Sequence, residues 1–509
     1  MTGKQLPLVE RRYESMDTCA ACRSCGGGTC NDARSKQLRK YSGVRFTSDG
    51  FDCALPVTID SHSHCSYACL YCFSEQLTGH TKTKVKPLGQ TSLSTLESVF
   101  SGGGGVDAGL FRMALKYDRR NGGGFPCPVQ LGGINDPCDN IERQQGWFLR
   151  FAELAIKYNQ PVRISTKGNV LREPDYLRVL SKAPHLFWVA FSIITCDDEL
   201  IERIDIGAPN VTERLKTMQV LSKLGVATSL RFRPMLPGVS DRTPRYRQAY
   251  KVLIERAAAA GCKAISYECG FYPSRGGNDV AKKWGQLSKV THVPFKALFD
   301  KIGSNEACRR ASPAWTENIM YAVQEEAKRH GLVVGVSDPI WKQLSDSGCC
   351  CGILPDDPVF GNWERENATE ALLRAKREGT TIWPEDIIPP WARHVLLSKM
   401  VAMAAGPLLV WKKRHTLWDE KLRNAWNDLH SQRGPLVYFQ GALQPTERRS
   451  NGDIGYKYVG LDRKHLPEVP FWDLTAGKPD LPIDVRHAQH CKLAERCDGK
   501  RCPKCIEHR

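Results

Sequence analysis

Cysteine is the residue type whose spacing points most directly to chemistry in this chain. The 509 residues include 21 cysteines, and most of them fall into four groups. In chain order the groups are Cys19, Cys22, Cys25 and Cys30; Cys65, Cys69 and Cys72; Cys349, Cys350 and Cys351; and Cys491, Cys497, Cys502 and Cys505. The first residues contain no apolar signal core, which favours the reducing cytoplasm, where disulfides are rare. The groups therefore indicate metal or iron–sulfur ligation, and the scattered cysteines are predicted to be small buried side chains.

The second group has the most specific spacing. Residues 64–73 read HCSYACLYCF, a C-x3-C-x2-C pattern directly after a short β-rich run. Three thiolates on one tight loop can bind three irons of a [4Fe–4S] cluster and leave the fourth iron without a protein ligand. Such an open iron can bind a small molecule directly, as the open position of a catalytic zinc does. The alternative is a zinc knuckle, for which His62 or His64 would supply a fourth ligand.

The elements that must position this loop follow from the hydrophobic pattern. Short β-rich runs alternate with amphipathic stretches, which indicates a parallel sheet covered by helices. The predicted strands are Val57–Asp60, Val129–Gly132, Val162–Thr166, Phe187–Ile193, Val226–Phe232 and Ala264–Glu268. The predicted helices are Gly146–Tyr158, Glu173–Ser181, Thr212–Leu224 and Arg245–Ala260. Six such units favour an α/β fold with an incomplete (β/α)6 barrel, similar to part of a TIM barrel, over a short open sheet.

The remainder of the chain extends this predicted core. The expected organisation is a cysteine-rich N-terminal extension (1–50), the core (51–300), a mixed and mostly helical region (301–480) and a cysteine-rich basic tail (481–509). Within the third region, Trp315–His330 is predicted to be helical and Val333–Val336 to be a strand. The glycine runs Gly102–Gly105 and Gly122–Gly124 lack the strand context and the lysine of a phosphate-binding loop, so they are predicted to be flexible loops.

The cysteine loop resembles the signature of the radical S-adenosylmethionine superfamily, here C-x3-C-x-Y-C. The resemblance extends over roughly residues 57–241, where the segments occur in the same order as in the spore-photoproduct-lyase-like branch. Its further segments are Gly132-Gly133-Ile134-Asn135-Asp136-Pro137, Glu142-Arg143, Ile164-Ser165-Thr166-Lys167, Phe191-Ser192-Ile193-Ile194-Thr195, Asp198-Glu199-Leu200, Ala208-Pro209, Arg214-Leu215, Leu224-Gly225 and Arg233-Pro234-Met235-Leu236-Pro237-Gly238. Several segments in the same order, each at a strand end or in the following helix, make coincidence a poor explanation.

The resemblance implies reductive cleavage of S-adenosylmethionine to a 5′-deoxyadenosyl radical that abstracts a hydrogen atom, while the protein positions the reactants and excludes water. It also implies a role for several residues at the carboxyl ends of strands, where barrels of this kind build their sites. By family position, the cluster ligands are Cys65, Cys69 and Cys72. The implied S-adenosylmethionine contacts are the backbone around Tyr71 for adenine, Gly132 and Gly133 for the amino group, Lys167 for the carboxylate and Ser192 for the ribose. A solvated lysine and a core hydroxyl are the alternatives for Lys167 and Ser192.

The family pattern breaks at one position that matters for the reaction. Spore photoproduct lyases carry a hydrogen-donating cysteine at the end of the second strand, just before the aspartate. Here Gly132-Gly133-Ile134 occupies that place, and Cys138 lies on the other side of Asp136. Thymine-dimer repair by the usual route is therefore not expected. The candidate catalytic thiols are Cys138 and Cys350. Adjacent side chains in the 349–351 triplet cannot wrap one ion alone, so one of these thiols is expected either to complete a distant site or to donate a hydrogen atom.

The two terminal cysteine groups leave more than one metal open. The spacing of Cys19, Cys22, Cys25 and Cys30 is typical of ferredoxin-like cluster loops, and zinc is the alternative. The group of Cys491, Cys497, Cys502 and Cys505 also fits either metal, with zinc favoured by nearby histidines. Basic residues around this last group suit a knuckle that contacts nucleic acid.

Charge narrows the class of substrate. The chain has 72 Lys and Arg against 55 Asp and Glu, a net charge of +17, which favours a polyanionic partner such as DNA or a nucleotide. The preferred hypothesis is a radical enzyme that rearranges a modified thymine in DNA, similar to bacteriophage isomerases that convert an N-linked glycyl substituent into a carbon-linked one. The alternatives are a peptide- or protein-modifying radical enzyme with auxiliary clusters, lyase-like DNA repair, and a zinc-dependent nucleic-acid-binding protein. An electron donor such as flavodoxin or ferredoxin is implied, no membrane partner is expected, and the expected location is the cytoplasm (of the host, if the chain is viral).

Overall fold

The structure is a computed structural model, and its description is confined to part of the chain. The described residues are 39–41, 43–47, 52–74, 89–103, 106–116, 125–273, 277–301, 308–361, 367–396, 416–431 and 433–461. The N-terminal and C-terminal cysteine groups, and with them the predicted extension and tail, lie outside these residues. The twelve cysteines whose side chains the structure describes are all free thiols.

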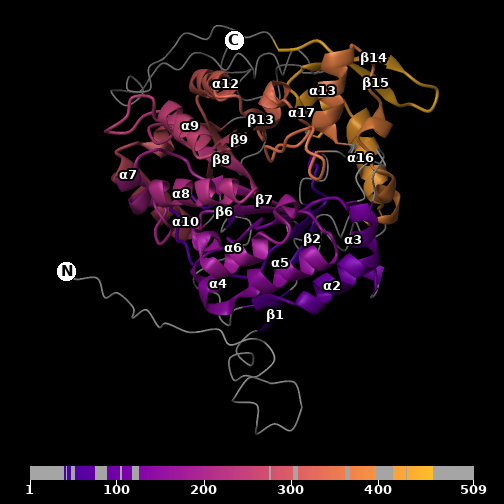
Figure 1. The fold of residues 1–509 in the computed structure, drawn as a ribbon. Coiled ribbons are helices and arrows are strands. Elements are labelled where there is room, and N and C mark those ends of the chain that lie inside the picture. The colour runs from indigo at the N-terminus through magenta and orange to yellow at the C-terminus, as the bar shows by residue number, and fades with distance from the viewer. Residues whose placement is uncertain are drawn as a thin grey trace, which may run out of the picture.

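An eight-stranded sheet forms the centre of the molecule (Figure 1). In spatial order its strands are β13 (Val333–Val336), β9 (Ala264–Cys269), β8 (Ala227–Met235), β7 (Phe187–Ser192), β6 (Val162–Thr166), β5 (Val129–Leu131), β3 (Val57–Ile59) and β2 (Val44–Phe46). All neighbouring strands are parallel except the antiparallel pair β2–β3. The parallel strands follow one another in chain order, so the sheet winds in one direction and stays open. The α/β partial barrel predicted from the sequence is confirmed, with all six strands predicted for the core present. β13, which was also predicted to be a strand, joins the sheet as a seventh parallel strand.

Helices fill the connections between these strands and lie around the outside of the sheet (Figure 1). The helices up to β9 are α2 (Leu93–Ser101), α3 (Val106–Lys116), α4 (Asn140–Gln145), α5 (Trp147–Lys157), α6 (Pro174–Leu180), α7 (Asp198–Ile204), α8 (Val211–Lys223) and α9 (Ala249–Ala259). Between β9 and β13 come α10 (Gly277–Thr291), α11 (Phe295–Leu298) and α12 (Pro313–Arg329). The predicted helices agree with α5, α6, α8, α9 and α12 to within a few residues. Helices α2 and α3 were not predicted, and Gly102, the first residue of a predicted glycine loop, ends α2 with a left-handed φ of 79°.

The two faces of the sheet differ in chemistry, because side chains alternate along a strand. One face carries apolar side chains such as Val129, Ile164 and Leu230, which are fully buried in the core. The other face, which we call the polar face, is lined by Gln130, Arg163, Ser165, Ser229, Arg231, Arg233, Ser266 and Glu268. The strand register supports one shared face, since Gln130 pairs with Arg163 and Arg231 pairs with Ser266. A parallel sheet that served only as scaffold would be apolar on both faces.

A downstream segment crosses the polar face. The hydroxyl of Ser266 donates to the carbonyl of Cys350 at 2.6 Å, and Arg163 Nη2 donates to the carbonyl of Cys351 at 3.4 Å. Farther along, the ring of Phe360 packs edge-on against Trp188, with 5.6 Å between centroids. The thiols of the 349–351 triplet therefore lie over the sheet and not in a separate domain.

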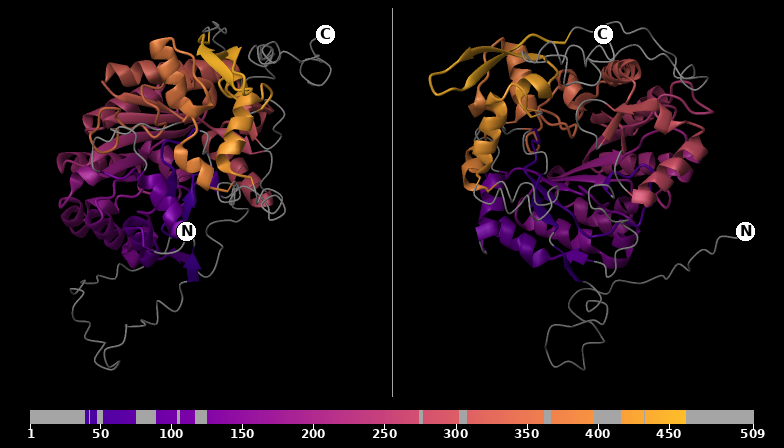
Figure 2. Two further views of the ribbon diagram at one scale, coloured as in Figure 1. Left: turned by 90° about the vertical axis from the view of Figure 1, so that its right-hand side faces the viewer. Right: turned by 180° about the vertical axis from the view of Figure 1, so that it is seen from behind.

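The C-terminal elements form a group beside the sheet, visible from two further sides in Figure 2. They comprise α13 (Ala368–Glu378), α16 (Trp418–Asn427), α17 (Pro435–Tyr438), β14 (Leu443–Arg448) and β15 (Ile454–Tyr458), the two strands forming a hairpin. The remaining strands are β1 (Arg39–Tyr41), which pairs with β4 (Gly89–Thr91), and β10 (Phe271–Pro273), β12 (Cys308–Ala311) and β11 (Phe299–Lys301), which form a small antiparallel sheet. Among the described helices, none combines the length and the apolar character that a membrane crossing would need.

A buried ionic network attaches this C-terminal group to the core. The carboxylate of Asp52, which is 1% exposed, lies 2.5 Å from the Lys342 ammonium group. The same carboxylate accepts hydrogen bonds from the backbone of Thr369 at 2.9 Å and from the hydroxyl of Tyr438 at 3.0 Å. We call these four residues the Asp52 network. It joins three distant parts of the chain to the segment just before β3.

Candidate functional site

The cysteine loop lies at the carboxyl end of β3 and is held there by hydrogen bonds from neighbouring connections. The backbone nitrogen of Ser66 donates to Asp139 Oδ2 at 2.5 Å, which ties the loop to the connection after β5. The backbone nitrogens of Ala68 and Leu70 donate to the carbonyls of Ile206 and Ile204 at 2.9 Å each, beyond β7. Three hydrogen bonds to two connections thus fix the path of a short loop that has no regular structure of its own.

Lys167 joins the cysteine loop to the end of β6. Its ammonium nitrogen lies 2.9 Å from Cys69 Sγ, 3.0 Å from the Tyr71 hydroxyl and 3.0 Å from Asp205 Oδ1. The same nitrogen lies 4.7 Å from the centre of the Tyr71 ring, within range of a cation–π interaction. Lys167 was predicted to be near the cofactor, and the structure brings it together with Cys69 and Tyr71.

Asp205 is the carboxylate at the centre of this cluster. It is fully buried at the end of α7, and its Oδ2 lies 2.8 Å from Nη1 of the equally buried Arg214 in α8. Burial alone would raise the pKa of Asp205, but Lys167 and Arg214 together lower it to about 2. Asp205 is therefore ionised at neutral pH and holds Lys167 in its charged form under Cys69.

The chemistry of the loop favours a cluster over a single zinc ion. Burial is the main cause that raises the pKa of Cys65 well above its usual range and that of Cys69 to about 12, so ligation must remove their protons. Both ring nitrogens of His62 are engaged, by Ser61 and Gln90 at 3.0 Å each. In a [4Fe–4S] cluster each thiolate binds a different iron, and the three thiols of the loop fit that donor set.

The connection after β5 is built around two acidic residues. The carboxylate of Asp60 accepts hydrogen bonds from the backbone nitrogens of Gly133 and Ile134 at 2.8 Å each. Asp136 Oδ1 accepts the Thr166 hydroxyl at 2.7 Å, and its Oδ2 accepts the backbone nitrogen of Lys167 at 2.6 Å. The carboxylates thus lock the ends of β3, β5 and β6 together.

The glycines of this connection are required by packing within the chain. Gly132 has a φ of +83°, and a Cβ there would lie 2.8 Å from the carbonyl oxygen of Ser165. A Cβ at Gly133 would lie 2.5 Å from the guanidinium of Arg45. These contacts explain both glycines without a ligand, so their predicted contact with a cofactor amino group stays a prediction.

The other predicted site residues fall in different places. Ser192 ends β7, and in the described part of the chain its hydroxyl has no hydrogen-bond partner. Cys138 is fully buried beneath Gly168, with its pKa raised chiefly by burial. Cys350 is half-buried over the polar face. The predicted catalytic roles of both thiols stay predictions, and the structure does not bring Cys138 and Cys350 into one cluster.

Sequence reasoning missed Asp205 and the role of Arg214. Arg214 belongs to a segment that carried the family resemblance, but its partner could not be named, because Asp205 lies in a connection without a motif. Sequence reasoning also missed the polar face. A signal for it exists in the alternation of VRIST in β6, SLRFR in β8 and ISYE in β9, which places polar residues at every second position.

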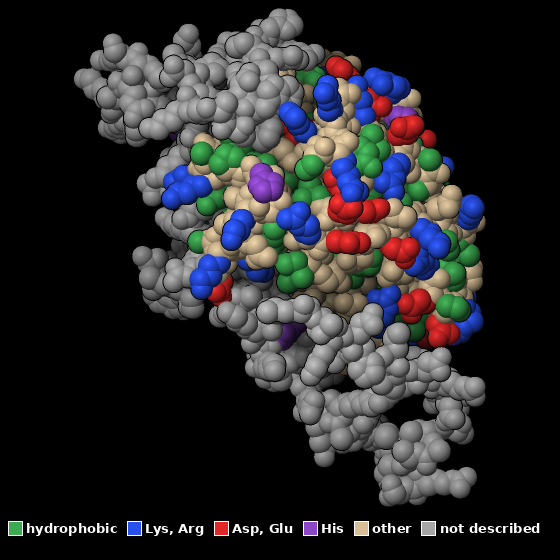
Figure 3. Space-filling view, turned by 90° about the vertical axis from the view of Figure 1, so that its left-hand side faces the viewer, with side chains coloured by type: hydrophobic (Ala, Val, Ile, Leu, Met, Phe, Trp, Pro, Cys, Tyr) green, Lys and Arg blue, Asp and Glu red, His purple; other side chains and the backbone are tan. Residues whose placement is uncertain are grey.

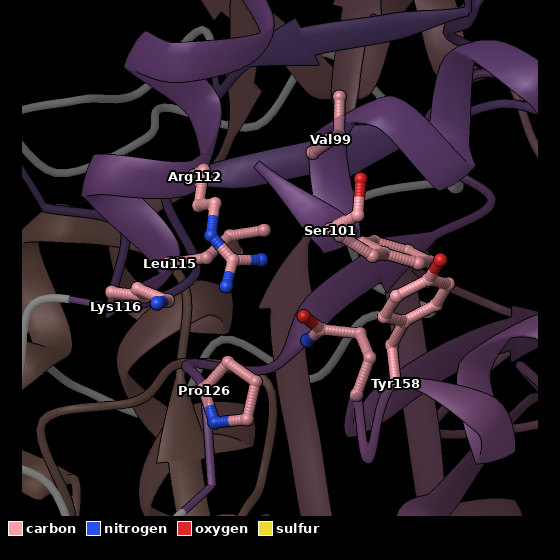
Figure 4. A pocket seen from close by; sticks show the side chains of 9 residues that line it. Val99, Ser101, Arg112, Leu115, Lys116, Pro126 and Tyr158 are labelled. Atoms are coloured by element: carbon pink, nitrogen blue, oxygen red, sulfur yellow. The ribbon is translucent and has the colours of Figure 1, made fainter. Parts of the chain in front are cut away.

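A cavity of about 350 Å³ lies at the amino ends of β5 and β6, at the opposite edge of the sheet from the cysteine loop (Figure 4). Arg112 and Lys116 of α3, Ser101 of α2 and Tyr158 after α5 line it, together with residues that precede β5 and β6. The cysteine loop follows the carboxyl end of β3, whereas this cavity lies where β5 and β6 begin. It is therefore separate from the candidate site.

Comparisons with known proteins give distant similarities. No family model matches the chain. Uncharacterized proteins of Mycobacterium bovis and Mycobacterium tuberculosis are 25% identical over 217 residues, which are 42% of this chain and 58% of each relative. A spore photoproduct lyase complexed with a dinucleoside spore photoproduct has a TM-score of 0.44 at 12% identity, covering 58% of this chain and 80% of that one. SuiB of Streptococcus suis bound to S-adenosylmethionine has a TM-score of 0.33 at 11% identity, covering 56% and 50%. The match spans little more than half of each mycobacterial relative, and none of these similarities transfers an activity to this chain.

Proposed function

We propose that this protein is a radical S-adenosylmethionine enzyme that acts on a nucleic-acid base. One observation carries the proposal: the C-x3-C-x2-C loop is fixed at the carboxyl edge of an open parallel sheet, with Lys167 against Cys69 at 2.9 Å. Cys65, Cys69 and Cys72 would hold a [4Fe–4S] cluster. When bound, the cluster and S-adenosylmethionine would supply an electron and a hydrogen-abstracting radical.

The protein's own residues position the reactants and exclude water. Tyr71 and Leu70 are buried beside the thiols and close the loop against the core. Lys167 holds positive charge beside Cys69 and is itself held by Asp205, so the charge is fixed before any ligand binds. Ser192, with its unpartnered hydroxyl at the end of the neighbouring β7, is available to a ribose or other polar ligand group.

We further propose that the substrate is a modified thymine in DNA whose substituent is rearranged, for example from an N-linked to a carbon-linked glycyl group. The net charge of +17 supports a polyanionic partner. On the face drawn in Figure 3, basic and acidic side chains are interspersed, so that face offers no single-sign field to a nucleic acid. The arginines of the polar face are the stronger attraction for a nucleotide.

The first experiment tests the radical chemistry. Protein reconstituted anaerobically with iron and sulfide is expected to cleave S-adenosylmethionine to 5′-deoxyadenosine, and Cys69→Ala should abolish both the product and the cluster's absorption. Cys262→Ala is the matched control, since Cys262 is also a buried thiol but lies before β9, away from the loop. Continued production by Cys69→Ala would refute the assignment of the loop.

The second experiment tests the substrate. Nucleosides from DNA made with and without the protein, in the presence of the other enzymes that modify the same thymine, are compared by mass spectrometry. The expected result is a thymidine derivative of unchanged mass and altered retention, because a rearrangement conserves atoms. Identical nucleoside profiles in both samples would contradict this substrate while leaving the first experiment unaffected.

A further inference from the structure

The polar face concentrates positive charge that the protein itself does not neutralise. Arg163 lies on β6, and Arg231 and Arg233 lie on β8, with β7 between the two strands. Glu268, whose Oε2 is 3.9 Å from Arg233 Nη1, is the carboxylate of this face. Lys342, the other buried cation of this region, is already neutralised by Asp52. Three guanidinium groups against one carboxylate leave a surplus of two charges.

The three arginines differ in what they bind. Arg163 is 1% exposed and donates to Gln130 Oε1 at 3.0 Å and to the carbonyl of Cys351 at 3.4 Å. Arg233 donates to the carbonyl of Cys350. These two therefore hold the segment that crosses the face, yet the Nε atom of each is buried without a hydrogen-bond partner.

Arg231 lies between them and has no such structural duty. Within the described residues, no hydrogen bond or ion pair engages its guanidinium. Burial, and then the charges of Arg233 and Arg163, lower the pKa of Arg231 to about 9. The Glu268 carboxylate acts on Arg231 but is the ion-pair partner of Arg233. A partly buried cation without an ion-pair partner of its own costs folding free energy, so Arg231 is expected to have a ligand.

We propose that Arg231, flanked by Arg163 and Arg233, binds a phosphate group of the substrate at the polar face. The planar guanidinium fork matches two phosphate oxygens, and the surplus of two charges matches a phosphate dianion. Arg231 pairs in register with Ser192 on β7, so this anion site adjoins the predicted cofactor site. The inference adds a phosphate-binding site to the proposed function. The role of this site in catalysis rests on that function.

The test measures binding to cluster-free protein, so it does not depend on radical chemistry. Isothermal titration compares thymidine 5′-monophosphate, thymidine, and a short thymidine-containing single strand. Arg231→Gln is expected to weaken binding of the phosphate-bearing probes at least tenfold and to leave thymidine unchanged. Arg245→Gln, at an exposed arginine paired with Glu199, should leave every affinity within about twofold.

The outcomes separate the sources of the phosphate. A loss confined to the monophosphate assigns the site to a free nucleotide, and a loss confined to the single strand assigns it to a DNA backbone. Equal affinities of Arg231→Gln and the unmodified protein for both probes would overturn the proposal. Failure of every protein to form 5′-deoxyadenosine would instead refute the proposed function and leave a phosphate-binding result standing.

Stability gives a second, independent measurement. Because Arg231 has no ion-pair partner of its own, Arg231→Gln is expected to raise the melting temperature of the ligand-free protein. A merely structural arginine would lower it on substitution. Arg231→Lys keeps the charge and loses the fork, so it should bind the phosphate probes with an affinity between those of the unmodified protein and Arg231→Gln.

Discussion

At the scale of single residues, Lys167 is the group that connects the thiols to the protein's own charge. It pairs with Asp205, and both burial and geometry make the pair part of the fold before any ligand arrives. A cation predicted from the sequence to meet a cofactor carboxylate is thus already engaged. Its removal should affect the stability of the cluster-free protein as well as ligand binding.

Lys167→Met is expected to destabilise the cluster-free protein by about 2 kcal/mol. Breaking a buried ion pair typically costs about 3–5 kcal/mol, and Arg214 still compensates Asp205 here. Urea unfolding under anaerobic conditions measures the loss. The control is Lys157→Met, at an exposed lysine paired with Glu97, which should leave the free energy of unfolding almost unchanged. Equal effects of the two substitutions would contradict the buried role of Lys167.

Individual residues also show where sequence reasoning ends. The thiols of the loop, Lys167 and Ser192 could be placed at strand ends, because periodicity fixes the strands and motifs fix the order. Asp205 could not, since its contact with Lys167 depends on how the connection after α7 folds back under the cysteine loop. Long-range pairing of this kind leaves no local pattern.

At the scale of elements, the junction of α4 and α5 contains a carboxyl group that prefers to be neutral. Both oxygens of Glu142 accept the backbone nitrogen of Phe148, at 3.0 and 2.9 Å, and Oε1 also accepts the Tyr176 hydroxyl at 2.9 Å. Burial outweighs these hydrogen bonds and raises the pKa of Glu142 to about 7. The folded chain therefore keeps this proton to a higher pH than the unfolded chain does.

The raised pKa of Glu142 predicts that the stability of the protein depends on pH, with a definite sign. Because the pKa is raised in the folded state, stability should fall as pH rises from about 4.5 to about 7, by about 3 kcal/mol from this group. Glu142→Gln keeps an acceptor and removes the ionisation, so it should lessen the fall. Urea unfolding at pH 5 and pH 8 provides the measurement. Glu97→Gln, at an exposed glutamate, should leave the fall as it is, and an unchanged fall in Glu142→Gln would refute the assignment.

The elements themselves were largely predictable. Seven strands and five helices follow from the pattern of their apolar residues, because each buries one face against the other layer. Helices α2 and α3 escaped prediction since glycine-rich sequence surrounds them and gives the appearance of continuous loop. The polar face could have been predicted from the alternation of polar and apolar residues in β6 and β8. A parallel sheet, however, is normally expected to be apolar on both faces.

At the scale of the whole molecule, the Asp52 network decides how the C-terminal group is attached. Asp52 and Lys342 are each 1% exposed, and their pairing links the segment before β3 to residues that follow β13. Through Thr369 and Tyr438 the same carboxylate reaches α13 and α17. One side chain therefore orients three later parts of the chain.

Asp52→Ala is expected to cost about 3–5 kcal/mol, because it leaves the Lys342 ammonium buried without a counter-charge. Hydrogen exchange should accelerate in α13 and in the β14–β15 hairpin more than in β6 and β7. Asp175→Ala, at an exposed aspartate paired with Arg178, is the control and should have almost no effect on either measurement. Uniform acceleration throughout the protein would contradict a local attachment.

The segment that crosses the polar face has a consequence for the order of synthesis. Strands β3 to β9 leave the ribosome well before residues 349–360, whose carbonyls receive Arg163 and Arg233. Until those residues emerge, the nascent sheet presents its guanidinium groups to water or to whatever anion is at hand. A shortened chain that stopped after β9 would keep strands β3 to β9 and the cysteine loop. It would lack the segment that crosses the polar face. Such a fragment should adhere to cellular RNA and precipitate, whereas the full chain should not.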